Sequence, residues 1–165
     1  MEFLFTPWRR RYVVEGEGRR DGCVFCNLQK EEERDFLFET EHWYGVLNAY
    51  PYCNGHMMIV ARRHLGWLGD LDQVALAELV PLMQRAERAL RLAYSPEGMN
   101  MGINFGSAGG AGIPGHLHVH LLPRWKGDTN FMSSIGGTRV VPEDLQLSFA
   151  KLSEAWKEAD GPAQD

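Results

Sequence analysis

Cysteine is scarce in this chain, and long apolar runs and excess positive charge are missing. The 165 residues contain three cysteines, an odd number that argues against a disulfide framework. No run of about 18 apolar residues occurs, so no membrane span is expected. The net charge is −5, whereas a nucleic-acid coat would need a basic face. These absences exclude a disulfide scaffold, a membrane protein and a general nucleic-acid binder.

The beginning of the chain also lacks the order of a signal peptide. Its apolar residues precede the basic residues Arg9, Arg10 and Arg11, whereas a signal peptide has the basic segment first. We therefore expect a cytoplasmic protein. The length fits a single domain, which we divide into an N-terminal arm (1–22), a core (23–125) and a C-terminal extension (126–165).

The hydrophobic pattern predicts an α+β domain with a mainly antiparallel sheet. A stripe at three- and four-residue spacing begins at Leu71 and ends near Ala93, which is typical of an amphipathic helix. Asp70 is its expected N-cap, and Pro81 is expected to kink or divide it. A short helix over 23–30 and a closing helix over 142–158 are also expected. Strands are predicted over 36–39, 43–48, 56–62, 99–105 and 116–122.

The segment His116-Leu117-His118-Val119-His120-Leu121-Leu122 carries the strongest chemical signal. Alternate residues of a strand share a face, so three imidazoles line one side while the apolar residues enter the core. Such a cluster can supply a nucleophile, an acid or metal ligands near neutral pH. Chance placement on a surface and a catalytic zinc site made of all three histidines remain alternatives.

A glycine-dense loop immediately precedes these histidines. Residues 106–112 read Gly-Ser-Ala-Gly-Gly-Ala-Gly, and this lack of side-chain bulk lets backbone N–H groups approach an anion. A glycine loop alone would usually be a tight connection. Beside nucleophilic histidines, it favours phosphate chemistry over the hydrolysis of a neutral substrate.

The histidine segment resembles the His-φ-His-φ-His-φ-φ signature of the histidine triad superfamily, where φ is apolar. Residues 48–56, Asn-Ala-Tyr-Pro-Tyr-Cys-Asn-Gly-His, are similar to the family's upstream segment. The segments at 7–9, 47–52, 123–125 and 127–132 resemble those of bacterial diadenosine tetraphosphate phosphorylases. The resemblance implies a half-barrel antiparallel sheet with helices, and a homodimer.

The resemblance also implies roles for individual residues. His118 matches the nucleophile that forms a nucleotidyl-histidine intermediate. His120 matches the histidine that supports the phosphate oxygens and the leaving group, and His56 matches the fourth histidine beside the same phosphate. Asn48 matches a ribose contact, and Asn104 matches a polar residue facing the phosphate. The remaining candidates for substrate binding are Gly106, Ser107, Gly112, His116 and Trp125. Asn104 as a strand-end cap and Trp125 as a core or interface residue remain alternatives.

Cys23 and Cys26 have the spacing of half a tetrahedral zinc site, although a redox-active or merely buried pair is also compatible with it. The resemblance completes the site with His64 and His116. Such a closed Cys₂His₂ set implies a structural zinc, with no catalytic metal required at His118. Cys53 is expected to be a structural thiol outside any disulfide.

The expected function is that of an enzyme cleaving dinucleoside polyphosphates, with phosphate or water as the acceptor. Hydrolysis of nucleoside phosphoramidates is the second possibility. The branch of the family with that activity carries a serine shortly before the triad, whereas this chain has Ile113-Pro114-Gly115 there. Leaving-group assistance by that serine is then absent or supplied by Ser107. A nucleotide-binding module with little turnover is the third possibility.

Overall fold

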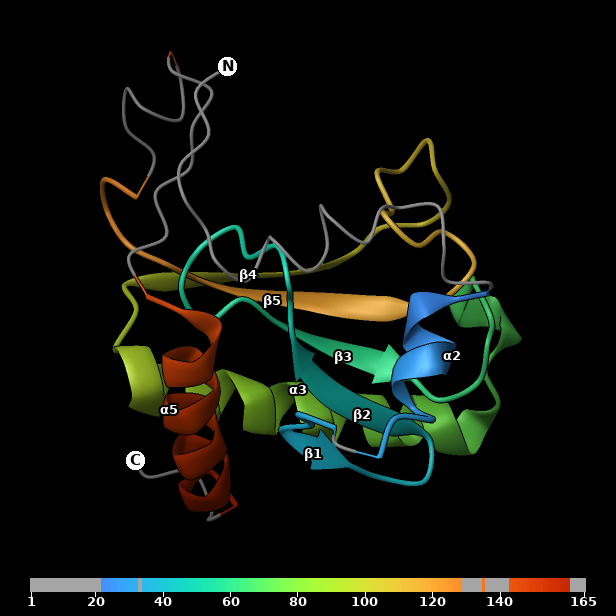
Figure 1. Ribbon diagram of the computed structural model, residues 1–165, viewed down its shortest axis with the longest axis horizontal. Helices are drawn as coiled ribbons and strands as arrows, with labels where there is room; N and C mark the ends of the chain where they lie inside the picture. The colour runs from blue at the N-terminus through green and yellow to red at the C-terminus, as the bar shows by residue number, and fades with distance from the viewer. Residues whose placement is uncertain (1–21, 33, 129–134, 136–142, 161–165) are drawn as a thin grey trace.

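The computed structural model describes residues 22–32, 34–128, 135 and 143–160. Five strands form one antiparallel sheet in the order β1-β2-β3-β5-β4, which confirms the predicted α+β class (Figure 1). The strands are β1 (Phe38–Glu39), β2 (Trp43–Leu47), β3 (Met57–Ala61), β4 (Gly98–Ile103) and β5 (His118–Arg124). The helices are α2 (Val24–Leu28), a 3-10 turn (Leu68–Asp70), α3 (Gln73–Tyr94) and α5 (Leu145–Glu158).

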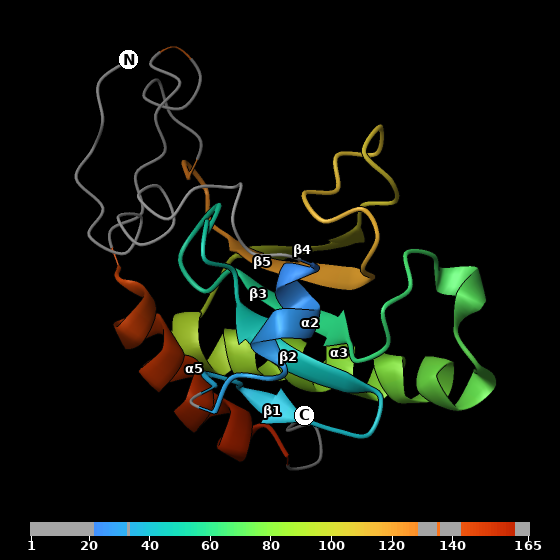
Figure 2. The same ribbon diagram turned by 45° about the vertical axis from the view of Figure 1, so that its right-hand side comes forward.

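The two faces of the sheet follow the alternation of side chains along the strands. One face packs against α3 and α5 in the main core; its strand residues include Trp43, Ile59, Val119 and Leu121. The other face carries a smaller cluster around Phe25 of α2, formed with Tyr44, Val46, Met58 and Val60. Figures 1 and 2 show α2 and α3 on opposite sides of the sheet. The apolar residues between the histidines therefore enter the main core, as the sequence predicted.

Helix α3 begins two residues later than the sequence predicted. Asp72, not Asp70, is the N-cap, and its side chain accepts a hydrogen bond from the Ala75 amide. Asp70 instead ends the short 3-10 turn. Pro81 does not divide the helix, which continues for 22 residues. Proline leaves the carbonyl four residues earlier without its helical donor, but Ala77 and Pro81 are both exposed, so water reaches that carbonyl.

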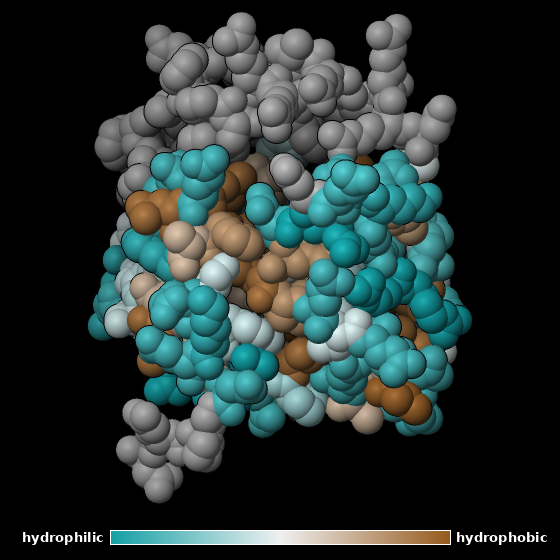
Figure 3. All heavy atoms as spheres, turned by 60° about the horizontal axis from the view of Figure 1, so that its bottom comes forward, coloured by the Kyte–Doolittle hydropathy of each residue, from teal (hydrophilic) through white to brown (hydrophobic). Residues whose placement is uncertain are grey.

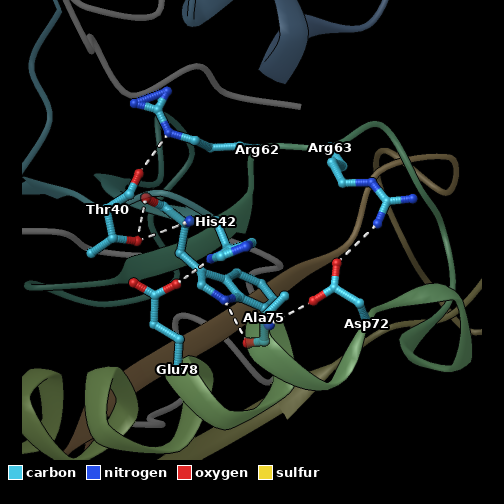
Figure 4. Close-up of polar contacts among 8 residues, drawn as sticks. Thr40, His42, Arg62, Arg63, Asp72, Ala75 and Glu78 are labelled. Carbon is cyan, nitrogen blue, oxygen red and sulfur yellow. Dashed lines mark hydrogen bonds and ion pairs between the residues drawn. The ribbon is translucent and has the colours of Figure 1, made fainter.

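The start of α3 is tied to the strands by polar contacts (Figure 4). The Trp43 indole donates to the carbonyl of Ala75, and the His42 ring lies 2.8 Å from a carboxylate oxygen of Glu78. Arg63 pairs with Asp72. These contacts fix the helix against β2 and also anchor the segment that follows β3.

Candidate active site and metal cluster

Strand β5 and its antiparallel neighbours place the histidines of the sequence motif. His118 lies opposite Val60 and His120 lies opposite Met58 of β3, on the face that α2 covers. On its other side His120 lies opposite Gly102 of β4. A Cβ atom at that glycine would meet nothing within 4 Å, so the space beside His120 is open. The edge of the sheet thus leaves room for a ligand at this histidine.

The backbone fixes the proton position in His118. Its Nδ1 lies 2.7 Å from the carbonyl oxygen of His116, an atom that only accepts hydrogen bonds. The neutral ring therefore carries its proton on Nδ1, which leaves an unshared electron pair on Nε2. The ring is buried and packs against Phe25, with centroids 5.1 Å apart. A fixed, neutral imidazole with a bare Nε2 is suited to nucleophilic attack.

His56 and His120 form the second half of the histidine cluster. His56 lies just before β3, and its Nε2 is 2.9 Å from Nδ1 of His120. The rings of His118 and His120 are 4.8 Å apart and nearly perpendicular. The structure thus brings together all three histidines that the sequence singled out as catalytic.

Burial keeps the triad histidines uncharged at neutral pH. Burial lowers the pKa of His118, against a smaller opposing effect of its hydrogen bond to the His116 carbonyl. Burial, with a smaller contribution from the nearby His118, lowers the pKa of His120 to about 4. Neutral rings at pH 7 can serve as a nucleophile and as a neutral hydrogen-bond donor.

This effect predicts an acid-sensitive fold. An unfolded histidine titrates near 6.5, so below that pH the unfolded chain binds a proton that folded His120 does not bind until about pH 4. Stability should fall as the pH drops through this window, by at most about 2 kcal/mol between pH 7 and pH 5 for this ring. Urea titrations at the two pH values measure the loss. The matched variant His120→Gln should show a smaller loss, and an equal loss would contradict the assignment.

Asn48 and Tyr52 complete the surroundings of His56. Asn48 follows β2, and its side-chain oxygen accepts from the amide of Tyr50 at 2.9 Å, while its nitrogen lies 3.4 Å from Nε2 of His56. The Tyr52 ring is tilted by 43° against the His56 ring, with centroids 4.6 Å apart, and Tyr52 is 47% exposed. The sequence motifs pointed to Asn48 but not to Tyr52 or Phe25. Tyr52 lies within the segment 48–56 and Phe25 lies between the two cysteines, and an aromatic residue inside such a motif was the only signal that could have indicated them.

The glycine loop is a compact, exposed turn at the end of β4. Gly106 and Gly110 have φ values of +64° and +86°, which side chains rarely adopt. The amide of Gly110 donates to the carbonyl of Ser107, and the Asn104 side chain donates to the carbonyl of Gly110 at 3.4 Å. Asn104 therefore braces the loop, which agrees with its alternative role at the strand end.

Trp125 lies apart from the histidine cluster, immediately after β5. Its ring packs edge-on against Tyr94 of α3 at 6.3 Å. Asp128 receives two hydrogen bonds from the Arg124 guanidinium and one from the Trp125 amide, which hold this turn. The structure thus shows the packing role for Trp125, and a nucleobase contact stays a prediction.

Cys53 donates its thiol to the carbonyl of Pro123 and forms no disulfide.

A second cluster lies at the other end of the histidine segment. One ligand atom from each of Cys23, Cys26, His64 and His116 lies within 4.8 Å of the other three. Nδ1 of His116 is 3.2 Å from the Cys23 sulfur and 3.6 Å from the Cys26 sulfur, and Nδ1 of His64 is 3.4 Å from the Cys26 sulfur. A tetrahedron with the usual zinc bond lengths has N···S edges of about 3.5 Å. The four residues therefore fit a zinc ion.

The chemistry of the donor atoms also fits a cation. Nε2 of His116 is 2.6 Å from the carbonyl of Ala61, so the neutral ring carries its proton there and turns the bare Nδ1 towards the sulfurs. Burial raises the pKa of Cys26, and the adjacent Cys23 raises it further. Two thiolates therefore need a positive charge between them. Nδ1 of His116 faces the cluster and its Nε2 donates to the Ala61 carbonyl, so the geometry gives no support to its predicted contact with substrate.

The segment that carries His64 is held firmly in place. The Arg62 guanidinium donates to the carbonyl of Thr40, and Arg63 pairs with Asp72 at the start of α3 (Figure 4). A Cβ atom on Gly66 would lie 2.9 Å from the carbonyl oxygen of Pro114. His64 is thus fixed between the start of α3 and the residues that precede His116.

Comparisons with known proteins agree with this geometry. The model of the HIT domain, the family named for its histidine triad, matches residues 29–127. This chain belongs to the HIT family. It is 36% identical to the "AP-4-A phosphorylase" of Mycobacterium tuberculosis, a match that covers 94% of this chain and 85% of the relative. It is 30% identical to an adenosine 5′-monophosphoramidase of Saccharomyces cerevisiae over 62% of each chain.

A solved structure of a HIT relative carries zinc. The zinc-bound histidine triad protein of Mycobacterium smegmatis superposes with a TM-score of 0.69 at 29% identity, covering 84% of this chain and 95% of that one. The named relatives include enzymes that act on adenine nucleotides, which confirms the predicted enzyme class.

Among the residues that the structure describes, no helix is both long and apolar enough to cross a membrane.

Proposed function

We propose that this HIT protein cleaves dinucleoside polyphosphates such as diadenosine tetraphosphate through a nucleotidyl-His118 intermediate. The observation that carries the proposal is the bare Nε2 of His118, fixed by the carbonyl of His116 and lying beside His120. The 36% identity with a relative named as an AP-4-A phosphorylase supports this substrate class. The 99-residue family match alone supports only chemistry on nucleotides.

The first step is a displacement at phosphorus. Nε2 of His118 attacks the α-phosphorus, a P–N bond forms, and the bond from that phosphorus to the bridging oxygen breaks. ATP leaves with this oxygen, and His120 is placed to assist it. AMP remains attached to His118. Fixing the nucleophile in a buried site reduces the reorganisation required for attack.

The second step transfers the nucleotidyl group to an acceptor. An oxygen of inorganic phosphate attacks the same phosphorus and gives ADP, or water attacks, releases a proton to solvent and gives AMP. In both cases the P–N bond breaks and His118 returns to its neutral form. No step requires a metal, and a zinc ion held by Cys23, Cys26, His64 and His116 would serve to fix the strand end.

Substrate contacts follow from the surroundings of the histidines. Asn48 is proposed to bind ribose. Amides of the loop from Gly106 to Gly112 other than those of Gly110 and Ala111, which donate within the loop, are proposed to bind phosphate oxygens, with the Ser107 hydroxyl beside them. Asn104 would act by bracing this loop through Gly110. Preorganised N–H groups stabilise developing negative charge without moving.

Phosphate is the acceptor that we expect. The glycine loop offers backbone donors for an oxyanion, so millimolar phosphate should accelerate the loss of diadenosine tetraphosphate and shift the products to ADP plus ATP. Chromatography of the products with and without phosphate measures both effects. AMP plus ATP at a rate independent of phosphate would contradict phosphorolysis and leave an asymmetric hydrolase.

Phosphoramidate hydrolysis is the second candidate, favoured by the similarity to the yeast monophosphoramidase. Ile113-Pro114-Gly115 lacks the serine expected shortly before the triad, which weighs against it. Comparing kcat/KM for adenosine 5′-monophosphoramidate and diadenosine tetraphosphate distinguishes the two enzymes. The absence of turnover with either substrate, together with nucleotide binding, would indicate a binding module.

A homodimer is also part of the proposed function. Helix α3 buries one side in the core but leaves Val74, Val80 and Leu92 more than half exposed. Seen from below, the molecule shows a hydrophobic area near the middle of a mostly hydrophilic face (Figure 3). A contiguous apolar area such as the one in Figure 3 favours a protein contact, and the family resemblance implies a homodimer. We expect sedimentation velocity at micromolar concentration to give a dimer, and a monomer alone would contradict this.

A further inference from the structure

The contact between His56 and His120 joins two buried rings across adjacent strands. His56 is 1% exposed and His120 is 8% exposed. Nε2 of His56 and Nδ1 of His120 are 2.9 Å apart, a normal hydrogen-bond length. Two neutral imidazoles share such a bond only if one nitrogen carries the proton and the other is bare. The direction of this bond decides whether Nε2 of His120 carries a proton and can donate to the substrate.

The backbone of Tyr52 decides that direction. Its amide lies 3.1 Å from Nδ1 of His56, and an amide can only donate. Nδ1 of His56 is therefore bare, and the proton of the neutral ring is on Nε2. Nε2–H then donates to Nδ1 of His120. His120 consequently carries its own proton on Nε2.

Asn48 offers a competing partner for His56 but does not reverse the assignment. Its side-chain oxygen is occupied by the Tyr50 amide, so its NH₂ group faces Nε2 of His56. The opposite tautomer of His56 would accept this group at 3.4 Å, but would place an Nδ1–H against the Tyr52 amide. Two donors facing each other at 3.1 Å cost more than a long contact at 3.4 Å gains.

From this chain of donors, we infer that His56 is a positioning residue that acts through His120, with both of its ring nitrogens engaged inside the protein. It makes Nε2–H of His120 the donor available to the leaving oxygen. The structural part of the inference stands on the free protein, whereas its catalytic consequence rests on the proposed function. The family resemblance instead placed His56 beside the phosphate.

The turn between β2 and β3 holds the Tyr52 amide in place. The amide of Asn48 donates to the carbonyl of His56, and the amide of His56 donates to the carbonyl of Cys53. Gly55 has a φ of +72°, and a Cβ atom there would lie 2.6 Å from the Tyr94 ring. The turn is therefore closed by its own backbone and packed against α3, so the direction of the Tyr52 amide is built into the fold.

The two reactive histidines consequently have opposite tautomers. The carbonyl of His116 keeps the proton of His118 on Nδ1, whereas His56 keeps the proton of His120 on Nε2. One ring offers a lone pair and its neighbour 4.8 Å away offers a proton. A nucleophile and a hydrogen-bond donor are thus made from the same residue type without a difference in charge.

Nitrogen-15 NMR of the imidazole rings in the nucleotide-free protein at pH 7 tests the assignment directly. We expect His120 and His56 to carry their protons on Nε2 and His118 to carry it on Nδ1. His120 protonated on Nδ1 would overturn the inference, even in a protein that cleaves diadenosine tetraphosphate. The expected tautomers in a protein without that activity would overturn only the proposed function.

Paired substitutions test the catalytic consequence. The amide nitrogen of glutamine reaches the place of imidazole Nε2, so His56→Gln keeps a donor to His120, and His56→Leu does not. We expect H56L to lower kcat about 100-fold with KM nearly unchanged, and H56Q to recover most of the rate. Folded H56L with a raised KM and normal kcat would indicate direct phosphate binding and overturn the inference. The tautomers of the wild-type protein decide the question if H56L does not fold.

Discussion

His118→Ala should lower kcat for diadenosine tetraphosphate by at least about a thousandfold while nucleotide affinity changes little. The variant removes the Nε2 lone pair that is fixed beside His120, so no P–N bond can form at this position. Loss of a covalent nucleophile costs several orders of magnitude. Single-turnover kinetics measure the loss, and calorimetry with a non-hydrolysable analogue measures binding.

His42→Ala is the matched control for this variant. His42 lies just before β2, where its ring pairs with Glu78 of α3, and it takes no part in the triad cluster. We expect it to retain most of the activity, with a modest loss of stability. A His118→Ala protein that kept more than about a tenth of the wild-type rate would refute covalent catalysis at this residue.

Cys26→Ser should remove zinc and lower the free energy of unfolding by at least about 3 kcal/mol, or roughly 6–12 °C in Tm. The wild-type protein should hold about one zinc per chain, because four ligand atoms lie within 4.8 Å of one another. Elemental analysis and calorimetry measure the two quantities. The loss of stability should precede the loss of catalytic rate, since the closed site has no position for substrate.

Cys53→Ser provides the control for cysteine replacement. Its sulfur contacts the carbonyl of Pro123 and lies outside the metal cluster, so the variant should keep its zinc. Metal-free wild-type protein with an unchanged Tm would show that the cluster does not stabilise the fold.

The histidine motif predicted the catalytic face because its chemistry and its alternation coincide. Leu117, Val119 and Leu121 enter the main core, which fixes His118 and His120 on the opposite side. The cysteine spacing suggested only half of a metal site from the residues themselves, and the family resemblance supplied the other half. The spatial proximity of His64 and His116 depends on the pairing of β3 with β5.

Other features could not be read from the sequence because they depend on backbone direction. The tautomer of His56 follows from where the Tyr52 amide points, and side-chain identity does not encode this. Asp70 and Asp72 are equivalent as caps by composition, and the 3-10 turn over Leu68–Asp70 decides between them. Pro81 is tolerated because it lies on the solvent side of the helix.

The position of the metal cluster has a consequence for how the chain folds. His64 follows β3 and His116 precedes β5, so the cluster closes the end of an antiparallel strand pair. A one-residue slip of that pair would turn His118 and His120 into the apolar core and expose Val119. Linking the strand ends through one ion would prevent such a slip. Zinc would therefore hold β3 and β5 in the correct register. Refolding without zinc should be slower and should yield inactive protein with misaligned strands. Zinc added after refolding should not promptly restore activity.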